Sequence, residues 1–266
     1  MPVKWIKMGL VVLVMGMIAL LSSIEAMARG LEKILSSGSI RIAIPQDSPP
    51  FGSLSPSGTF DGYDVEVANM IAKDLDVKLE LVPVDSKNRI PFLVTNKVDL
   101  IISSLGVDPK RALTIDFSNA YAPFFWGVFG PKKIAVRSAA DTKGFKVGAT
   151  LGTLEELAFS ESAPEGVTIK RFDDQATTVA AFIAGHVDLI VTGSAIAAKL
   201  IKDNPSKLIE TKYIMRQSPC HIGVRKGDAD LLNWVNVFIY SHKLNGDLDK
   251  LSLKWFGEPL PTFPQF

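Results

Sequence analysis

Arg111, in the segment Asp108-Pro-Lys-Arg111, is the residue best suited to bind a small anion. A guanidinium group presents a planar fork of donors that can hold a carboxylate through two parallel, charge-assisted hydrogen bonds. A surface arginine in a turn is the alternative, and this segment alone favours it. Ser103 and Ser104 end a buried apolar run just before it, where strand ends commonly face a ligand crevice. We expect Ser104 to donate a hydrogen bond to a ligand, with strand-end packing as the alternative.

The segment Gly152-Thr-Leu-Glu-Glu156 is a second candidate for anion binding. It follows an apolar strand and opens a helix, so its amide groups would point at a bound anion, and we expect Thr153 to contribute. Thr153-x-x-Glu156 is also the signature of a capping box, which needs no ligand. Glu155 or Glu156 could act as a general acid, but we expect both to lie at a solvated helix N-terminus.

Enzymatic sites find little support in the residues. The chain has three histidines and one cysteine, and Cys220 and His221 are neighbours that would point to opposite faces of a strand. The histidines lack metal-ligand spacing, and the sequence contains neither a phosphate-binding glycine loop nor a Gly-x-Ser-x-Gly segment. The residues therefore give little reason to expect an enzyme, and we expect neither a metal nor a cofactor.

Two similar runs indicate the elements that would position these residues. VDLIIS starts at Val98 and VDLIVT starts at Val187, each typical of a parallel strand buried on both faces. Each follows a segment with helical spacing that ends at Asn96 or Gly185. Strands at 39–44 and 145–149 would open two similar α/β lobes, unless the likeness of such short runs arises by chance.

The N-terminal segment has the features of a cleaved secretory signal peptide at residues 1–28. Lys4 and Lys7 precede an apolar run from Met8 to Leu21, and Ala26-Met-Ala28 is a signal peptidase pattern. Cleavage would remove two of 29 basic and one of 28 acidic residues, leaving no net charge and no basic stripe for nucleic acid. The single cysteine excludes a disulfide framework, so we expect a soluble periplasmic protein.

Several longer motifs resemble the polar amino-acid family of periplasmic solute-binding proteins of ABC transporters. The resemblance covers nearly all of residues 38–258 and is carried by the segments Phe60-Asp-Gly-Tyr-Asp-Val-Glu-Val-Ala68, Asn88-Arg-Ile-Pro91, Asp108-Pro-Lys-Arg111, Thr114-Ile-Asp-Phe-Ser118 and Val224-Arg-Lys-Gly-Asp228. It implies an α/β fold of two lobes that close on a ligand. Lobe 1 would hold residues 29–122 and 219–266, and lobe 2 residues 123–218, with crossings near 121–123 and 216–219.

The resemblance also implies roles for individual residues. Arg111 would hold the ligand carboxylate, and Arg89 would reach the distal end of the ligand unless it forms a salt bridge on the lobe surface. We expect a monomer that delivers its ligand to a membrane permease. The full set of candidate ligand-binding residues is Arg111, Ser104, Gly106, Thr153, Arg89, Ser103 and Asp47.

Two positions depart from the pattern of the family. Gly193 stands where amino-acid-specific members usually carry the aspartate that pairs with the ligand's ammonium group, and Leu154 stands where a hydroxyl residue is common. Either Asp47 or Asp85 takes over the ammonium group, or the ligand is an organic acid without one. An amino acid is the leading class, and a cyclohexadienyl dehydratase on the same fold is the enzymatic alternative. Aromatic residues that flank loops could line the pocket or belong to the core, namely Phe51, Tyr63, Phe124, Phe125 and Trp126.

Overall fold

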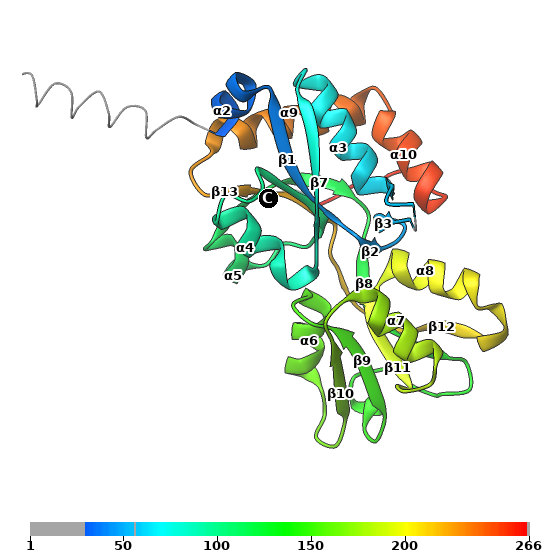
Figure 1. The fold of residues 1–266 in the computed structure, drawn as a ribbon. Helices are drawn as coiled ribbons and strands as arrows, with labels where there is room; N and C mark the ends of the chain where they lie inside the picture. The colour runs from blue at the N-terminus through cyan, green and yellow to red at the C-terminus, as the bar shows by residue number, and fades with distance from the viewer. Residues whose placement is uncertain (1–29, 56, 265–266) are drawn as a thin grey trace, which may run out of the picture.

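The computed structural model describes residues 30–55 and 57–264, which form two lobes, each built on a five-stranded sheet (Figure 1). The proposed signal peptide lies outside the described residues. The sheet of lobe 1 has the order β5 (Lys78–Val84), β1 (Ser39–Pro45), β6 (Leu100–Leu105), β13 (Cys220–Arg225) and β7 (Ile115–Ala122). The sheet of lobe 2 has the order β10 (Thr168–Phe172), β9 (Lys146–Thr150), β11 (Leu189–Gly193), β8 (Phe125–Pro131) and β12 (Ile209–Gln217).

The two repeated runs occupy the central position of each sheet. β6 contains most of the first run and β11 most of the second, and both strands are almost wholly buried, as predicted. The prediction of parallel sheets was wrong in part. β6 pairs parallel with β1 but antiparallel with β13, and β11 pairs parallel with β9 but antiparallel with β8. Burial of both faces dictates the composition of a strand, whereas the direction of its neighbours depends on the connections.

Helices cover both sheets (Figure 1). Those of lobe 1 are α2 (Gly30–Ser37), α3 (Tyr63–Asp74), α4 (Arg89–Val94), α5 (Pro109–Ala112), α9 (Ala229–Leu244) and α10 (Asp247–Phe256). Those of lobe 2 are α6 (Leu154–Ser162), α7 (Gln175–Ile183) and α8 (Ser194–Asp203). Short 3-10 helices occur at η1 (Ser86–Asn88), η2 (Ala140–Thr142) and η3 (Pro205–Lys207). As predicted, Asn96 and Gly185 follow helices α4 and α7 in left-handed conformations, with φ of 59° and 77°.

Each sheet separates two apolar cores, which explains why its central strand is buried on both faces. In β1, Ile42 and Ile44 pack into one core of lobe 1 with Ile71 of α3. Ala43 points the other way and packs with Leu93 of α4. The strand period of two residues therefore serves both layers of helices, and the last residues of β1 and β6 emerge at one edge of the sheet.

Two strand connections carry the chain between the lobes. β7 of lobe 1 continues through Pro123 and Phe124 into β8 of lobe 2, and β12 returns through Ser218 and Pro219 into β13. A small antiparallel sheet of β2 (Asp47–Ser48), β3 (Gly52–Leu54) and β4 (Phe60–Asp61) extends from lobe 1. Over the described ranges, none of the helices has the length and apolar character needed to cross a membrane.

Candidate functional site

The candidate site is a narrow cleft between the two lobes, beside the connecting segments. Its lining residues are Ser48, Ser86, Arg89, Ser104, Gly106, Arg111, Phe124, Thr153, Leu154, Glu155, Gln175, Ile196 and Ser218. Five of the seven predicted site residues are among them, and Ser103 and Asp47 are not. The cavity volume is only about 20 Å³, little more than the space of one water molecule. The lobes are therefore closed on each other.

Arg111 projects from the short helix α5 and contacts both lobes. The Asp108 side chain caps this helix by accepting hydrogen bonds from the amides of Lys110 and Arg111, so Arg111 does not belong to a flexible turn. Its guanidinium donates to the Gly106 carbonyl oxygen at 3.2 Å and to the Gly152 carbonyl oxygen of lobe 2 at 3.0 Å. Burial and, secondly, the nearby Arg89 charge lower the pKa of Arg111 to about 10. The group remains a cation at neutral pH.

Arg89 lies deeper and holds the end of strand β6. It is 7% exposed, and its Nη1 donates to the carbonyl oxygens of Ser103 at 2.8 Å and Ser104 at 3.4 Å. Its Nη2 donates to Ser86 Oγ. Burial lowers the pKa of Arg89. These contacts show that Arg89 is not the exposed salt-bridge residue that the sequence left open.

Asp64 of α3 fixes the backbone of Ser104, and sequence reasoning missed it. Ser104 has a φ of 42°, a conformation that is strained for a residue with a side chain. Asp64 Oδ2 accepts from the Ser104 amide at 2.9 Å, and its Oδ1 accepts from the Tyr121 hydroxyl at 2.6 Å. Asp64 is fully buried, and burial raises its pKa to about 7. The sequence showed only an acid in the first turn of a helix.

Gly106 of lobe 1 and Thr153 of lobe 2 both line the cleft. A Cβ on Gly106 would lie 2.8 Å from Ser218 Oγ and 2.9 Å from Leu154 Cδ1, so a larger residue there would force these side chains to move. Thr153 is the N-cap of α6, where its hydroxyl accepts from the Glu156 amide at 3.2 Å and donates to the Thr150 carbonyl at 2.8 Å. The predicted capping role of Thr153 is thus confirmed, and the same residue lines the cleft.

Phe124 fills the space beside Gly193. A Cβ on Gly193 would lie 1.9 Å from Phe124 Cζ, far inside van der Waals contact. Phe124 is 9% exposed and packs edge-on against Phe51, with ring centroids 5.6 Å apart. Among the five aromatic candidates, Phe51, Tyr63 and Trp126 are buried in the protein, and Phe124 lines the cleft. An aromatic ring therefore occupies the position where a side chain at 193 would lie.

Both glutamates of the α6 N-terminus are buried, so the expectation of a solvated role was wrong. Glu155 is 7% exposed and lines the cleft, and burial raises its pKa while the charges of Arg89 and Arg111 oppose that rise. Glu156 is 4% exposed and accepts from Arg171 Nε at 2.7 Å and from Ser160 Oγ at 3.1 Å. An acid-rich segment usually indicates solvent, but here the helix packs its first turn against lobe 1.

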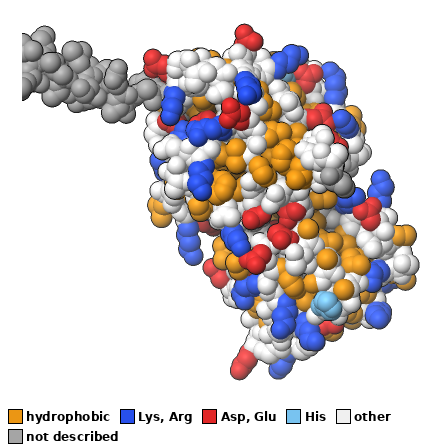
Figure 2. All heavy atoms as spheres, viewed as in Figure 1, with side chains coloured by type: hydrophobic (Ala, Val, Ile, Leu, Met, Phe, Trp, Pro, Cys, Tyr) orange, Lys and Arg blue, Asp and Glu red, His pale blue; other side chains and the backbone are white. Residues whose placement is uncertain are grey.

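Asp47 links the two lobes outside the cleft lining. Its Oδ2 accepts hydrogen bonds from the amides of Gln175 at 2.6 Å and Ala176 at 3.2 Å, at the N-terminus of α7 in lobe 2. Nearby, Lys87 Nζ lies 2.5 Å from Asp173 Oδ1 across the same boundary. Burial raises the pKa of Asp47, and the neighbouring charges of Asp174 and Asp85 contribute to that rise. Acidic side chains gather where the lobes meet on the face shown in Figure 2.

We expect Asp47→Ala to weaken closure and thereby lower the affinity for any ligand by about tenfold. The estimate takes about 1.5 kcal/mol for the loss of one charge-assisted contact, because the two amides share the single acceptor Asp47 Oδ2. Titration calorimetry would measure the affinity, and small-angle scattering would measure the radius of gyration. Asp85→Ala is the matched control, because Asp85 accepts from Gln46 Nε2 within lobe 1. Equal behaviour of the two variants would contradict the role of Asp47 in closure.

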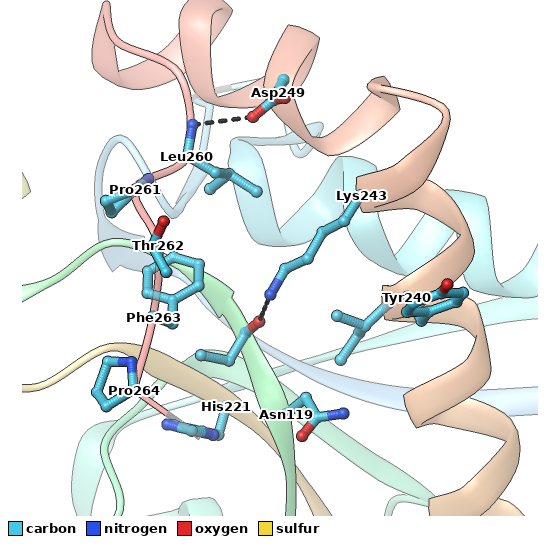
Figure 3. Close-up of a pocket in the computed structure, with 12 residues that line it drawn as sticks. Asn119, His221, Tyr240, Lys243, Asp249, Leu260, Pro261, Thr262, Phe263 and Pro264 are labelled. Carbon is cyan, nitrogen blue, oxygen red and sulfur yellow. Dashed lines mark hydrogen bonds between the residues drawn. The ribbon is translucent and has the colours of Figure 1, made fainter.

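A larger cavity of about 320 Å³ lies on lobe 1 away from the cleft, beneath the C-terminal segment (Figure 3). In Figure 3, Lys243 points across it toward β7, where Nζ donates to the Ala120 carbonyl at 2.6 Å. The same ammonium lies 4.7 Å from the centroid of the Phe263 ring. The Leu260 amide donates to Asp249 Oδ1 at 3.0 Å. These contacts tie the C-terminal segment to α9 and α10, and they do not involve lobe 2.

The protein has two α/β lobes, two connecting strand segments and an arginine-lined cleft between the lobes. These features define the class of two-lobed periplasmic binding proteins. The comparisons with known proteins agree with this class. Residues 40–258 match the model of the bacterial extracellular solute-binding proteins, family 3, and the chain belongs to this family.

Relatives and solved structures are similar over most of the chain. The L-cystine-binding protein of Escherichia coli is 30% identical, over 85% of this chain and 86% of its own length. The L-arginine-binding protein of Pseudomonas aeruginosa is 27% identical, over 90% of this chain and 96% of its own length. The L-cysteine receptor of Neisseria gonorrhoeae is 32% identical with a TM-score of 0.79, covering 85% of this chain and 92% of that one.

A reconstructed protein is also similar. An ancestral amino acid-binding protein, described as a precursor of cyclohexadienyl dehydratase, is 32% identical with a TM-score of 0.78. The similarity covers 85% of this chain and 99% of that one. The fold is therefore shared by binding proteins and by the ancestor of an enzyme.

Proposed function

We propose that this protein is the periplasmic solute-binding component of an ABC importer, and that it captures a small carboxylate-bearing solute, first of all an amino acid. The observation that carries the proposal is the position of Arg111. Its guanidinium lies in the interlobe cleft and donates to backbone carbonyls of both lobes. A ligand carboxylate would accept the same donors with the added strength of an ion pair. Relatives that bind L-cystine and L-arginine support an amino acid as the ligand.

Closure of the lobes is the proposed mechanism of capture. We assign residues 29–122 and 219–266 to lobe 1 and residues 123–218 to lobe 2, with a hinge at the two connecting segments. Arg111 with Ser104 and Gly106 would bind the carboxylate from lobe 1, and Thr153 would complete the site from lobe 2. The small cavity volume supports ligand entry through an open form, because an amino acid is much larger than the space present. The protein would act as a monomer and deliver its ligand to a membrane permease.

A dehydratase acting on a cyclohexadienyl acid is the second candidate. It is favoured by one observation, the buried Glu155 in a cleft with two arginines, because burial raises the pKa of a carboxyl group toward the range of a general acid. The similarity to a dehydratase precursor points the same way. We place it second, since the relatives compared above are named for binding.

Thermal-shift screening of residues 29–266 against amino acids and organic acids, with product analysis, separates the two candidates. We expect at least one carboxylate-bearing solute to raise the melting temperature and to be recovered unchanged. Consumption of a cyclohexadienyl acid, without stabilisation by any other compound, would establish the enzyme instead. Stabilisation only by compounds that lack a carboxylate would contradict both.

A further inference from the structure

Three charged side chains line the cleft among the described residues, and they come from different lobes. Arg89 and Arg111 belong to lobe 1, and Glu155 belongs to lobe 2. The two guanidinium groups are within Coulombic range of the carboxylate, since their charges oppose the rise in its pKa. Closing the lobes therefore brings one carboxylate and two guanidinium groups around the same small cavity.

The environment of Glu155 is that of a ligand-binding residue rather than that of a residue in a structural ion pair. It occupies the second position of α6, after the cap Thr153 and Leu154, where the helix dipole favours an anion. Its carboxylate interacts with its own backbone amide. The adjacent Glu156, by contrast, forms an ion pair with Arg171 within lobe 2. No salt bridge involves Glu155 among the described residues, so its burial as a carboxylate is unfavourable, and a cation in the cleft would relieve that cost.

The other acids considered for a ligand cation are committed elsewhere. Asp47 accepts two amide hydrogen bonds at the N-terminus of α7, and Asp85 accepts from Gln46 Nε2. Neither lines the cleft. At position 193 the Phe124 ring fills the space beside the glycine, so an aromatic surface faces the ligand there.

We propose that Glu155 binds a cationic group of the ligand, and that the ligand is a zwitterion whose carboxylate is held by Arg111 of the opposite lobe. This inference rests on the proposed function and specifies its substrate class. A zwitterion would join the lobes at both poles, with its carboxylate on α5 and its cation on α6. An organic acid without a cation would satisfy Arg111 but leave Glu155 buried beside a second anion. Such a ligand is disfavoured by like-charge repulsion.

The test compares Glu155→Gln with Glu156→Gln, using matched ligands. The probes are the common L-amino acids and their 2-hydroxy analogues, which keep the carboxylate and side chain but lose the ammonium group. Thermal shift selects the pairs that bind, and calorimetry gives their affinities. We expect Glu155→Gln to lower the affinity for the amino acid by at least about tenfold while the 2-hydroxy acid binds as well as before or better. Glu156→Gln should leave the ratio of the two affinities unchanged.

Two outcomes would overturn the inference without affecting the proposed function. One is an equal loss of affinity for both ligand types in Glu155→Gln. The other is stabilisation of the wild-type protein by 2-hydroxy acids alone. In both cases binding must still require Arg111. Ligand binding that does not depend on Arg111 would instead contradict the proposed function. A change in melting temperature without ligand would identify a folding effect of Glu155→Gln, and the ratio of affinities, measured within one variant, is independent of it.

Discussion

Arg111→Ala should lower ligand affinity by at least about a hundredfold, corresponding to about 3 kcal/mol, while the protein remains folded. The guanidinium is the group of the cleft that already donates to carbonyl oxygens of both lobes, so its loss removes the proposed carboxylate partner and one link between the lobes. Replacement by alanine leaves a ligand carboxylate buried beside Ser104 and Gly106 without its counter-ion. Calorimetry with any ligand found by thermal shift would measure the change.

Two variants serve as controls for this result. Lys110→Ala removes the neighbouring charge, whose side chain is 88% exposed and lies 3.9 Å from Glu161, and should leave affinity unchanged. Arg111→Lys keeps the charge but loses the planar fork, so its affinity should fall between those of the alanine variant and the wild type. An Arg111→Ala affinity within about threefold of the wild type would show that the carboxylate binds elsewhere.

The sequence predicted much of the scaffold because repeated patterns carry information about burial. The two VDLI runs and the helices before them predicted the central strand of each sheet, and the matching strand orders explain why the phrase occurs twice. The antiparallel direction of β8 and β13 could not be predicted in this way. Both strands come from the connecting segments, and their pairing depends on how the chain returns between lobes rather than on local composition.

Motifs in the sequence identified candidate residues of the site. The burial and neighbours of other side chains depend on tertiary packing, and the sequence did not predict them. Arg111 was proposed from the family resemblance and Thr153 from its position at a helix start, and the structure places both at the cleft. Glu155 was assigned to solvent, because nothing local shows that the first turn of α6 packs against the other lobe. Gly193 showed that a side chain was missing, but only the fold shows that Phe124, from a distant segment, fills its space.

Asp64 should make the stability of the protein depend on pH, with greater stability in mild acid. Its pKa is raised from 3.8 to about 7, chiefly by burial, while the Tyr121 and Ser104 hydrogen bonds and the Arg89 charge act in the opposite direction. A raised pKa in the folded state means that the folded protein binds the proton more tightly than the unfolded chain. The resulting stabilisation is fully present below about pH 4 and is lost as the pH rises through about 7. For a shift of about three units it amounts to about 4 kcal/mol.

The measurement is urea unfolding of the wild type and of Asp64→Asn between pH 4.5 and 8. Over this range we expect the free energy of unfolding of the wild type to fall by about 3 kcal/mol relative to that of the variant. The Asp64→Asn variant is needed as a reference because other groups also titrate in this pH range. Burial also raises the pKa of Glu155 and Asp47, which adds stability in acid, whereas it lowers the pKa of His221, which has the opposite effect.

Tyr121→Phe separates the titration of Asp64 from a general loss of packing. Phenylalanine keeps the ring that stacks on Tyr63 but removes the hydroxyl that donates to Asp64 Oδ1. Because that hydrogen bond favours the ionised carboxylate, its loss should raise the pKa of Asp64 further and extend the loss of stability to higher pH. The carboxyl carbon of Asp64, followed by NMR, should titrate near 7 in the wild type and higher in the variant. Parallel pH profiles for the wild type and Asp64→Asn would instead show that Asp64 is ionised throughout, stabilised by Arg89 and its two donors.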